Sequence, residues 1–221
     1  EMTMNKQING KASATYLWED LGIVPFLKID SGLEPEENGV HLLKNIYEID
    51  KKLEIAVSKG IFGTKMRSVI NLASEKGIND VVEQQFKISE RINKYNLIPI
   101  IEPEITISIS DKKSAEKILI KSILNNLDEL PKDSKVILKL SLPEIMNFYL
   151  PLIDHPNVLR VVALSGGYDQ RNALDKLRCN NGMIASFSRA LTEGLSINQN
   201  DDEFNLIINK SIHDIATASK I

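Results

Sequence analysis

Two glutamates stand inside an apolar, β-branched segment, IPIIEPEIT, at residues 98–106. Side chains two residues apart in a strand point to the same face, so Glu102 and Glu104 are expected to face one place. Burying one carboxylate in an apolar core is costly, and burying two like charges side by side costs more. The pair therefore predicts a polar cavity with lysines across it, serving either catalysis or a structural cluster of salt bridges.

A single lysine, Lys139, lies among leucines in the apolar segment VILKL at residues 136–140. One interpretation is a lysine at a strand end whose ammonium group reaches out to solvent. The other is a desolvated, neutral amine that attacks a carbonyl and forms a Schiff base, with Lys65 as the nearby cation that disfavours a second charge. In that case Glu102 or Glu104 could protonate and remove the carbinolamine hydroxyl.

A phosphate site is indicated by the segment LSGGY at residues 164–168, in which Ser165, Gly166 and Gly167 follow a predicted strand. Glycines let backbone N–H groups approach an anion, and the N-terminus of the helix expected next favours negative charge. An SGG sequence by itself is equally compatible with a simple turn. The segment SFSRAL at 186–191 adds Arg189, whose guanidinium could fork onto the same phosphate.

The charges expected at the strand ends differ in sign from the whole chain, which has a net charge of −3. Cations outnumber anions there: Lys28, Lys65, Arg67, Lys139 and Arg189 stand against Asp30, Glu102 and Glu104. A positive cleft in a negative protein suits a phosphorylated substrate.

The elements that must position these side chains are short apolar segments that alternate with longer amphipathic ones. The predicted strands cover residues 24–29, 61–66, 97–104, 135–140, 158–164 and 183–188. Apolar residues at helical spacing predict helices between them, as over 78–95 and over 114–130, the latter with Asp111 or Ser114 as its N-cap. Strand and helix alternating along the chain favour a parallel sheet with right-handed crossovers.

Charged residues recur in four of these strands at a constant interval of 37 residues: Lys28, Lys65, Glu102 and Lys139. Each βα unit thus delivers a polar group near the carboxyl end of its strand, where (β/α)8 barrels build their active sites. A doubly wound sheet also binds ligands at carboxyl ends, but mainly at one switch point. We therefore predict an α/β fold of the (β/α)8 TIM-barrel type.

A complete barrel has eight strands and about 250 residues, whereas these 221 residues supply six predicted strands. The chain also begins with Glu1 rather than with a start methionine. We expect residues 1–221 to form a single TIM-barrel domain that lacks its first two βα units and supplies about strands 3 to 8. Six strands alone would leave two unpaired sheet edges, which invites aggregation.

Composition argues against several classes of protein. The net charge of −3 gives no sign of nucleic-acid binding, and no apolar run approaches the roughly 18 residues that cross a bilayer. The lone cysteine, Cys179, cannot form a disulfide within the chain, which favours a reducing, cytoplasmic setting. The histidines, His41, His155 and His213, stand at no metal-ligand spacing, so nothing predicts a metal site.

The motifs VPFLKIDSG, FGTKMRS, IPIIEPEI, VILKL, VVALSGGY and SFSRAL occur in this order along the chain. Together they resemble the class I fructose-1,6-bisphosphate aldolases, most of all the bacterial branch. The resemblance implies a TIM barrel without metal or other cofactor. It also implies reversible cleavage of fructose 1,6-bisphosphate to dihydroxyacetone phosphate and glyceraldehyde 3-phosphate, in glycolysis and gluconeogenesis, with sugar phosphates as the binding partners.

The resemblance further implies a role for each site residue. Lys139 would form the Schiff base, Glu102 would be the acid–base residue that dehydrates the carbinolamine, and Glu104 would support the lysine and the proton transfers. The others would act on substrate: Lys65 and Arg67 near the carbon–carbon bond that breaks, Lys28 near the second phosphate, and Ser165, Gly166, Gly167 and Arg189 at the phosphate on the ketone side.

The chain departs from this family at its start, where the aspartate and serines of the family's first strands have no counterpart. Two alternatives therefore stay open. One is another Schiff-base aldolase or transaldolase that acts on a sugar monophosphate and does not need Lys28. The other is an inactive, truncated fragment that binds sugar phosphates. The sequence leaves the oligomeric state open, including a homo-oligomer.

Overall fold

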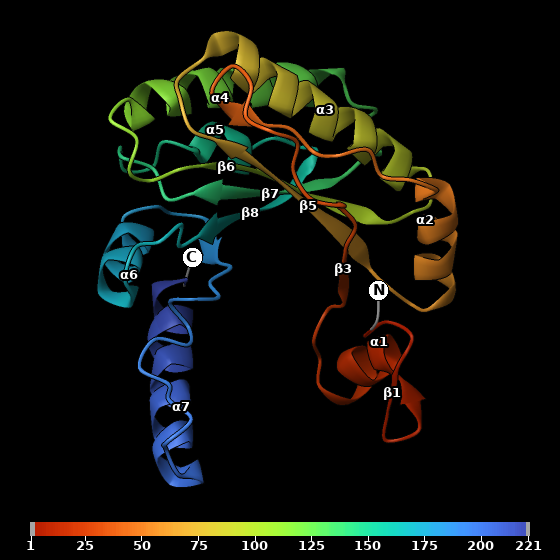
Figure 1. The fold of residues 1–221 in the computed structure, drawn as a ribbon, viewed down its shortest axis with the longest axis vertical. Helices are drawn as coiled ribbons and strands as arrows, with labels where there is room; N and C mark the ends of the chain where they lie inside the picture. The colour runs from red at the N-terminus through yellow and green to blue at the C-terminus, as the bar shows by residue number, and fades with distance from the viewer. Residues whose placement is uncertain (1–2, 220–221) are drawn as a thin grey trace.

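The fold is organised around a curved parallel sheet, seen edge-on in the computed structural model of Figure 1, which describes residues 3–219. Neighbouring strands of its main path are parallel and follow the chain order. The path runs through β3 (Phe26–Lys28), β5 (Gly63–Ile70), β6 (Ile98–Ile105), β7 (Val136–Ser141), β8 (Val158–Leu164) and β9 (Met183–Ala185). The predicted α/β class with a parallel sheet is confirmed.

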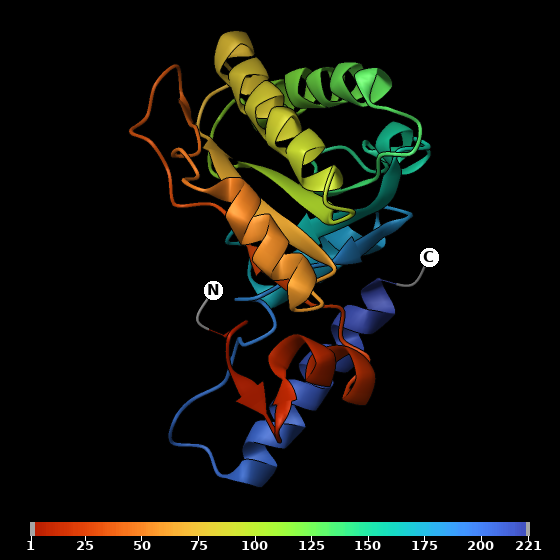
Figure 2. The same cartoon turned by 90° about the vertical axis from the view of Figure 1, so that its right-hand side faces the viewer.

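Helices connect the strands and cover the outer side of the sheet. Figures 1 and 2 show α2, α3 and α4 together on this side, with α7 and the N-terminal segment beyond the opposite side. Their bounds are α2 (Ile49–Ser58), α3 (Glu75–Asn93), α4 (Lys112–Glu129), α5 (Leu150–Ile153), α6 (Gln170–Arg178) and α7 (Asp201–Ala218). No helix within residues 3–219 has the length and apolarity needed to cross a membrane.

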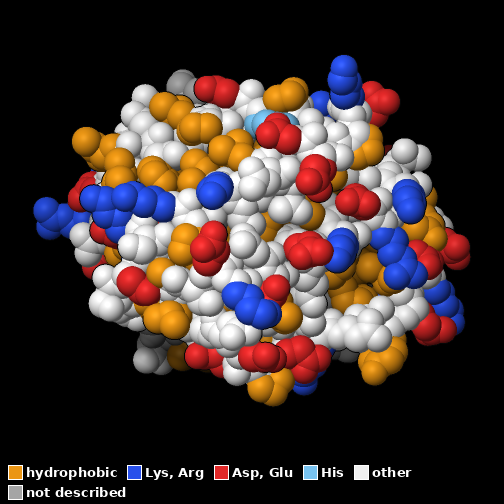
Figure 3. All heavy atoms as spheres, turned by 90° about the horizontal axis from the view of Figure 1, so that it is seen from above, with side chains coloured by type: hydrophobic (Ala, Val, Ile, Leu, Met, Phe, Trp, Pro, Cys, Tyr) orange, Lys and Arg blue, Asp and Glu red, His pale blue; other side chains and the backbone are white. Residues whose placement is uncertain are grey.

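Helix α3 shows why these segments become helices. The Ser74 side chain caps it by accepting a hydrogen bond from the Gly77 N–H at 3.2 Å. One face is buried against the sheet at helical spacing, and the other carries charged pairs such as Lys76 with Asp80 at 2.6 Å. Figure 3, which views the molecule from above, shows side chains of both charges interspersed over the surface. The buried face consists of Gly77, Ile78, Val81, Val82, Gln85, Phe86, Ser89 and Ile92.

The start of α4 differs from the prediction. Asp111 occupies the N-cap position, but its side chain makes no capping hydrogen bond. The Asp111 carboxylate instead accepts a hydrogen bond from the Ala73 N–H at 2.8 Å. The residue therefore joins the loop before α4 to the loop before α3, which holds two neighbouring crossovers together.

The shortest elements were not predicted. They are the antiparallel hairpin of β1 (Gln7–Ile8) and β2 (Lys11–Ala12), the helical segment α1 (Ser13–Thr15), and β4 (Val40–His41), which pairs antiparallel with β5. A further helical segment, η1 (Tyr16–Asp20), continues α1. The expectation of an absent start rests partly on Glu1, which lies outside the described residues. The division into one domain that lacks two βα units stays a prediction.

Alternation along the strands decides which side chains reach the inner side of the sheet. In β7, Leu138 and Leu140 are fully buried, so Lys139 between them points to the opposite face. In β5, Met66 is likewise fully buried, and Lys65 lies on the other face. The apolar core thus sits between sheet and helices, and the lysines face away from it.

Candidate active site

The strand register brings the predicted site residues to one rim of the sheet. Arg67 of β5 pairs with Glu102 of β6. Pairing between β6 and β7 ends at Ile101 with Leu138, the residues that directly precede Glu102 and Lys139. Carboxyl ends of parallel strands meet at one edge, so the interval of 37 residues in the sequence becomes proximity in space.

Glu102 lies between two lysines. Its Oε2 atom is 2.6 Å from the Lys65 Nζ atom, and its Oε1 atom is 3.1 Å from the Lys139 Nζ atom. The Lys139 side chain is 15% exposed and the Glu102 side chain 4% exposed. Lys139 therefore does not extend into bulk solvent. Glu102, which stands in an otherwise apolar strand, has two cations as its partners.

Glu104 shares this face but has its own partner. It forms an ion pair with Arg67, which is more exposed than the glutamate. Both glutamates line one pocket, so the expectation that they face the same place is confirmed. The repulsion between the two carboxylates is offset because each has its own cations: Lys65 and Lys139 for Glu102, and Arg67 for Glu104.

The pocket has a volume of ≈ 410 Å³ and joins the ends of β5, β6, β7, β8 and β9. Two serines in its lining, Ser186 and Ser188, were not predicted as site residues, although both lie in the segment SFSRAL. Their position one and three residues before Arg189, just past a strand, was the available signal. The lining consists of Arg67, Glu102, Glu104, Lys139, Leu164, Ser165, Gly166, Ser186, Ser188 and Arg189.

Three predicted residues do not line this pocket: Lys28, Lys65 and Gly167. Lys65 still reaches the site through Glu102. Lys28 is 60% exposed, and its Nζ atom lies 2.5 Å from the Oδ1 atom of Asp30. The Asp30 side chain is 4% exposed, and its Oδ2 atom is buried without a hydrogen-bond partner.

The Ser165–Gly167 segment forms a tight turn beside the pocket. Gly166 and Gly167 have φ angles of +61° and +110°, which favour glycine. A Cβ atom on Gly166 would lie 2.7 Å from the Ile107 Cγ2 atom, so the turn packs closely on the loop after β6. Helix α6 follows, and Asp169 caps it by accepting a hydrogen bond from the Asn172 N–H at 2.8 Å.

Where β6 separates from β7, other groups hold its backbone. The Glu102 N–H donates to the Oε1 atom of Gln85, a fully buried residue of α3, at 2.9 Å. The Ser141 hydroxyl donates to the Ile105 carbonyl at 2.7 Å. These bonds fix the strand segment that carries both glutamates, and sequence reasoning identified neither Gln85 nor Ser141 as a supporting residue.

Arg189 lies on an exposed segment after β9. Within residues 3–219 it has no ion-pair partner, so its guanidinium is available to an anion. The Gln170 side chain donates a hydrogen bond to the carbonyl of the next residue, Ala190, at 2.9 Å. Helix α6 therefore fixes the backbone beside the arginine.

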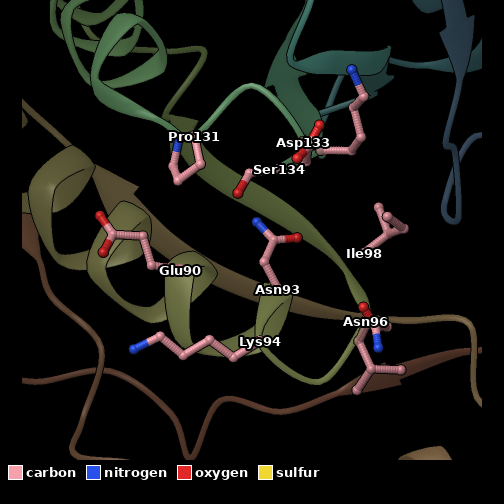
Figure 4. A pocket seen from close by; sticks show the side chains of 10 residues that line it. Glu90, Asn93, Lys94, Asn96, Ile98, Pro131, Asp133 and Ser134 are labelled. Atoms are coloured by element: carbon pink, nitrogen blue, oxygen red, sulfur yellow. The ribbon is translucent and has the colours of Figure 1, made fainter.

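A second pocket of ≈ 410 Å³ lies at the opposite ends of β6 and β7 (Figure 4). Its lining includes Asn96 and Ile98 at the start of β6 and Lys135 before β7. It does not contain the ion pairs of Glu102 or Glu104. Barrel enzymes build their sites at carboxyl ends of strands, so the pocket around Lys139 is the candidate active site.

The described residues contain no group of three histidine, cysteine, aspartate or glutamate side chains that could hold a metal ion. The expected independence from metals remains a prediction.

Comparison with known proteins identifies similar enzymes. The chain is 52% identical over 219 residues to the class 1 fructose-bisphosphate aldolase of Clostridium acetobutylicum, covering 99% of this chain and 74% of that protein. The enzymes of the same name from Synechocystis sp. and Porphyromonas gingivalis are 51% and 50% identical, again over 219 residues that cover 99% of this chain and 73% and 74% of their lengths. No family model matches the chain.

A solved structure supports the fold independently. The fructose-bisphosphate aldolase of Plasmodium falciparum superposes with a TM-score of 0.74 at 17% identity, covering 99% of this chain and 75% of that one. The predicted barrel fold is thereby confirmed for the part of a barrel that this chain supplies. At about half identity along its whole length, the chain belongs to the class I fructose-bisphosphate aldolases.

Proposed function

We propose that the protein is a lyase that reversibly cleaves fructose 1,6-bisphosphate to dihydroxyacetone phosphate and glyceraldehyde 3-phosphate. The observation that carries the proposal is a mostly buried amine, Lys139 Nζ, 3.1 Å from the Oε1 atom of Glu102 in a pocket at the strand ends. Membership of the aldolase family supports it. The proposed Schiff-base formation and the proposed cleavage of the carbon–carbon bond both proceed without a metal or another cofactor.

Lys139 acts as the nucleophile. After transfer of a proton from its ammonium group, with Glu102 as the neighbouring acceptor, the Nζ atom attacks the C2 carbonyl of the substrate and forms a carbinolamine. A carboxyl group in contact with the amine can then protonate the hydroxyl, which leaves as water. Lys65, on the other oxygen of Glu102, keeps that carboxyl in place at 2.6 Å.

The resulting iminium draws in the electron pair of the C3–C4 bond. The C4 hydroxyl gives its proton to the Glu104 carboxylate, the bond breaks, and the aldehyde product leaves. The electron pair remains on the carbon next to the iminium until that carbon is protonated and water releases the ketone. Glu104 supports these proton transfers, and Arg67 beside it stabilises charge near the breaking bond.

Phosphate groups anchor both ends of the substrate. Ser165, the backbone N–H groups of Gly166 and Gly167, and Arg189 hold the phosphate on the ketone side, where the turn and the guanidinium converge. Lys28 binds the second phosphate once it separates from Asp30. The position of Lys28 outside the pocket lining gives the monophosphate alternative its support.

Trapping the Schiff base tests the proposal. Borohydride and dihydroxyacetone phosphate are added, and mass spectrometry locates the adduct; we expect it on Lys139 in the wild type and on no residue in Lys139→Met. Lys132→Met, at an exposed position, is the matched control. If Lys139 stays unmodified in folded wild-type protein, the proposal is wrong.

Two further assays separate the alternatives. The first assay compares the turnover of fructose 1-phosphate with that of fructose 1,6-bisphosphate. An enzyme that acts on a monophosphate does not need Lys28 to bind a second phosphate, so it should not prefer the bisphosphate. Calorimetry beside the activity assay identifies a protein that binds sugar phosphates without turning them over. Activity that survives a chelator supports the metal-independent mechanism.

A further inference from the structure

We propose that Tyr168 is a positioning residue for the phosphate-binding turn, held by an ionic cluster behind the pocket. The inference rests on the proposed role of the Ser165–Gly167 turn. We define the Glu144 cluster as the five residues Lys112, Glu116, Glu144, Tyr168 and Lys176, none of which lines the pocket around Lys139.

The turn packs on the Ile107 side chain, but few hydrogen bonds hold its shape. Its two glycines bring no side-chain contacts, and both adopt left-handed φ angles. One backbone hydrogen bond, from the Tyr168 N–H to the Ser165 carbonyl at 2.9 Å, closes it. Tyr168 is thus the first residue after Ser165 with a side chain that can tie the turn to the rest of the protein.

The Tyr168 side chain makes two polar contacts. Its hydroxyl donates to the Oε1 atom of Glu144 at 3.2 Å, and the Lys176 Nζ atom lies 5.1 Å from the centre of its ring. Burial, followed by the charge of Glu144, raises the pKa of Tyr168 well above its usual value. The hydroxyl therefore keeps its proton and stays a donor at neutral pH.

A single carboxylate oxygen of Glu144 accepts hydrogen bonds from several donors. Its Oε1 atom also lies 3.2 Å from the Lys112 Nζ atom and 3.4 Å from the Lys176 Nζ atom. Its backbone N–H lies 3.2 Å from both carboxylate oxygens of Glu116. The acceptor of the Tyr168 hydroxyl is therefore fixed through both its side chain and its backbone.

Lys112 and Glu116 form the buried base of the cluster. Their side chains are 4% and 1% exposed and make an ion pair within one turn of α4. Lys112 also donates to the Leu142 carbonyl at 2.8 Å, just beyond β7. An ion pair this deeply buried has few ways to rearrange, because any displacement leaves a charge without a partner.

The cluster joins the segments that follow three neighbouring strands. Helix α4 follows β6, which carries both site glutamates; Leu142 follows β7, which carries Lys139; and Tyr168 follows β8 and the turn. Tyr168 therefore sets the turn relative to the strand that carries the nucleophile. Loosening this link is expected to weaken binding of the phosphate group without changing the amine chemistry.

Tyr168→Phe tests the inference, because it removes one hydroxyl and keeps the ring beside Lys176. Two ketones are compared in borohydride trapping: dihydroxyacetone phosphate and dihydroxyacetone, which lacks the phosphate. We expect half-saturation by the phosphorylated ketone to need about threefold to tenfold more ligand, the effect of one lost hydrogen bond, and half-saturation by the other ketone to stay unchanged. Tyr47→Phe, at a position 74% exposed, is the matched control.

Inorganic phosphate is measured in parallel by calorimetry on the same variants. This arm separates the inference from the proposed function, since it needs no Schiff base. If the wild type forms no adduct, weaker phosphate binding by Tyr168→Phe than by Tyr47→Phe still supports the positioning role. Unchanged affinity for phosphate and for dihydroxyacetone phosphate overturns it, and so does an equal loss for both ketones, which would indicate general damage to the site.

Discussion

Two clusters in this protein bring lysines against buried glutamates, and they differ in what surrounds the amine. Lys112 is 4% exposed and contacts three oxygens, those of Glu116, Leu142 and Glu144. An ammonium has three N–H donors, so each of them has an acceptor. Lys139 has one ion-pair partner within residues 3–219, Glu102, and lines a pocket.

The comparison teaches that burial alone does not make a lysine reactive. In a site where all three N–H donors of an ammonium have acceptors, removing a proton would leave one of those acceptors unpaired and the nearby carboxylates without a cation. A lysine with a single carboxylate partner and an open side can hand its proton to that partner and meet a carbonyl. The number of acceptors, together with access, distinguishes the two sites.

Replacement of Lys139 should produce the largest effect on activity. Lys139→Met removes the amine proposed to form the iminium, so we expect cleavage of fructose 1,6-bisphosphate to fall below detection in a coupled assay. The unfolding midpoint should change little, since Glu102 keeps Lys65 as its partner. Residual turnover above that of an uncatalysed blank would contradict the assignment of the nucleophile.

Removing the charge of Glu102 should have the next largest effect. Glu102→Gln eliminates the acid–base group beside Lys139, and we expect kcat to fall by about 10²- to 10⁴-fold. Glu104→Gln is the comparison, and a smaller loss is expected because Arg67, not Lys139, is its partner. Equal losses would show that the two carboxylates share the role.

Lys112→Met should damage stability rather than chemistry. The change leaves the Glu116 carboxylate buried without its partner, which typically costs about 3–5 kcal/mol of unfolding free energy. Lys113→Met, one residue along on the exposed side of α4, should stay within about 0.5 kcal/mol in the same urea titration.

A second substitution sharpens this prediction. Glu116→Gln added to Lys112→Met removes the orphaned charge yet keeps an acceptor for the Glu144 N–H, so it should recover part of the loss. Failure of the double variant to recover would show that the lysine matters through packing and not through charge.

The smallest expected effect concerns pH. Burial alone would raise the pKa of Glu144, but Lys112 and Lys176 together hold it below its usual value of 4.5. A carboxyl with a lowered folded-state pKa stabilises the protein above 4.5, and this contribution is lost as the pH falls through the lowered value. Glu144→Gln should therefore narrow the difference in unfolding free energy between about pH 6 and about pH 3. If the difference in unfolding free energy is unchanged in the variant, groups other than Glu144 cause the loss of stability at low pH.

The sequence predicted the sheet well where apolar strands are long. The strand over 158–164 matches β8 at both ends, and the interval of 37 residues correctly placed charged groups at one rim. Strand β5 runs on to Ile70, beyond the predicted end at residue 66, because the alternation continues past Lys65 and Arg67. The two-residue strands β1, β2 and β4 are too short to leave a periodic signal. Strands β1 and β2 pair only with each other in a hairpin, and β4 depends on pairing with the more distant β5.

Burial of charge was the hardest part to predict. The segment KKSAEK resembles a solvated helix start, yet Lys112 and Glu116 are buried and Lys113 is exposed. A signal did exist: Lys112 and Glu116 fall on the helical positions that continue through Leu119 and Ile123, the buried face of α4. Amino-acid composition alone does not reveal a buried ion pair of this kind, whereas the helical spacing of its two residues does.

The hydrogen bond from the Glu102 amide to Gln85 couples an outer helix to the proposed acid–base residue. That amide proton is shielded from deuterium as long as α3 stays docked on the sheet. Its exchange rate therefore reports undocking of a helix that packs directly on β6, the strand whose two glutamates line the pocket. Hydrogen exchange at the backbone of the proposed catalytic acid would thus measure how firmly the outer helical layer is held.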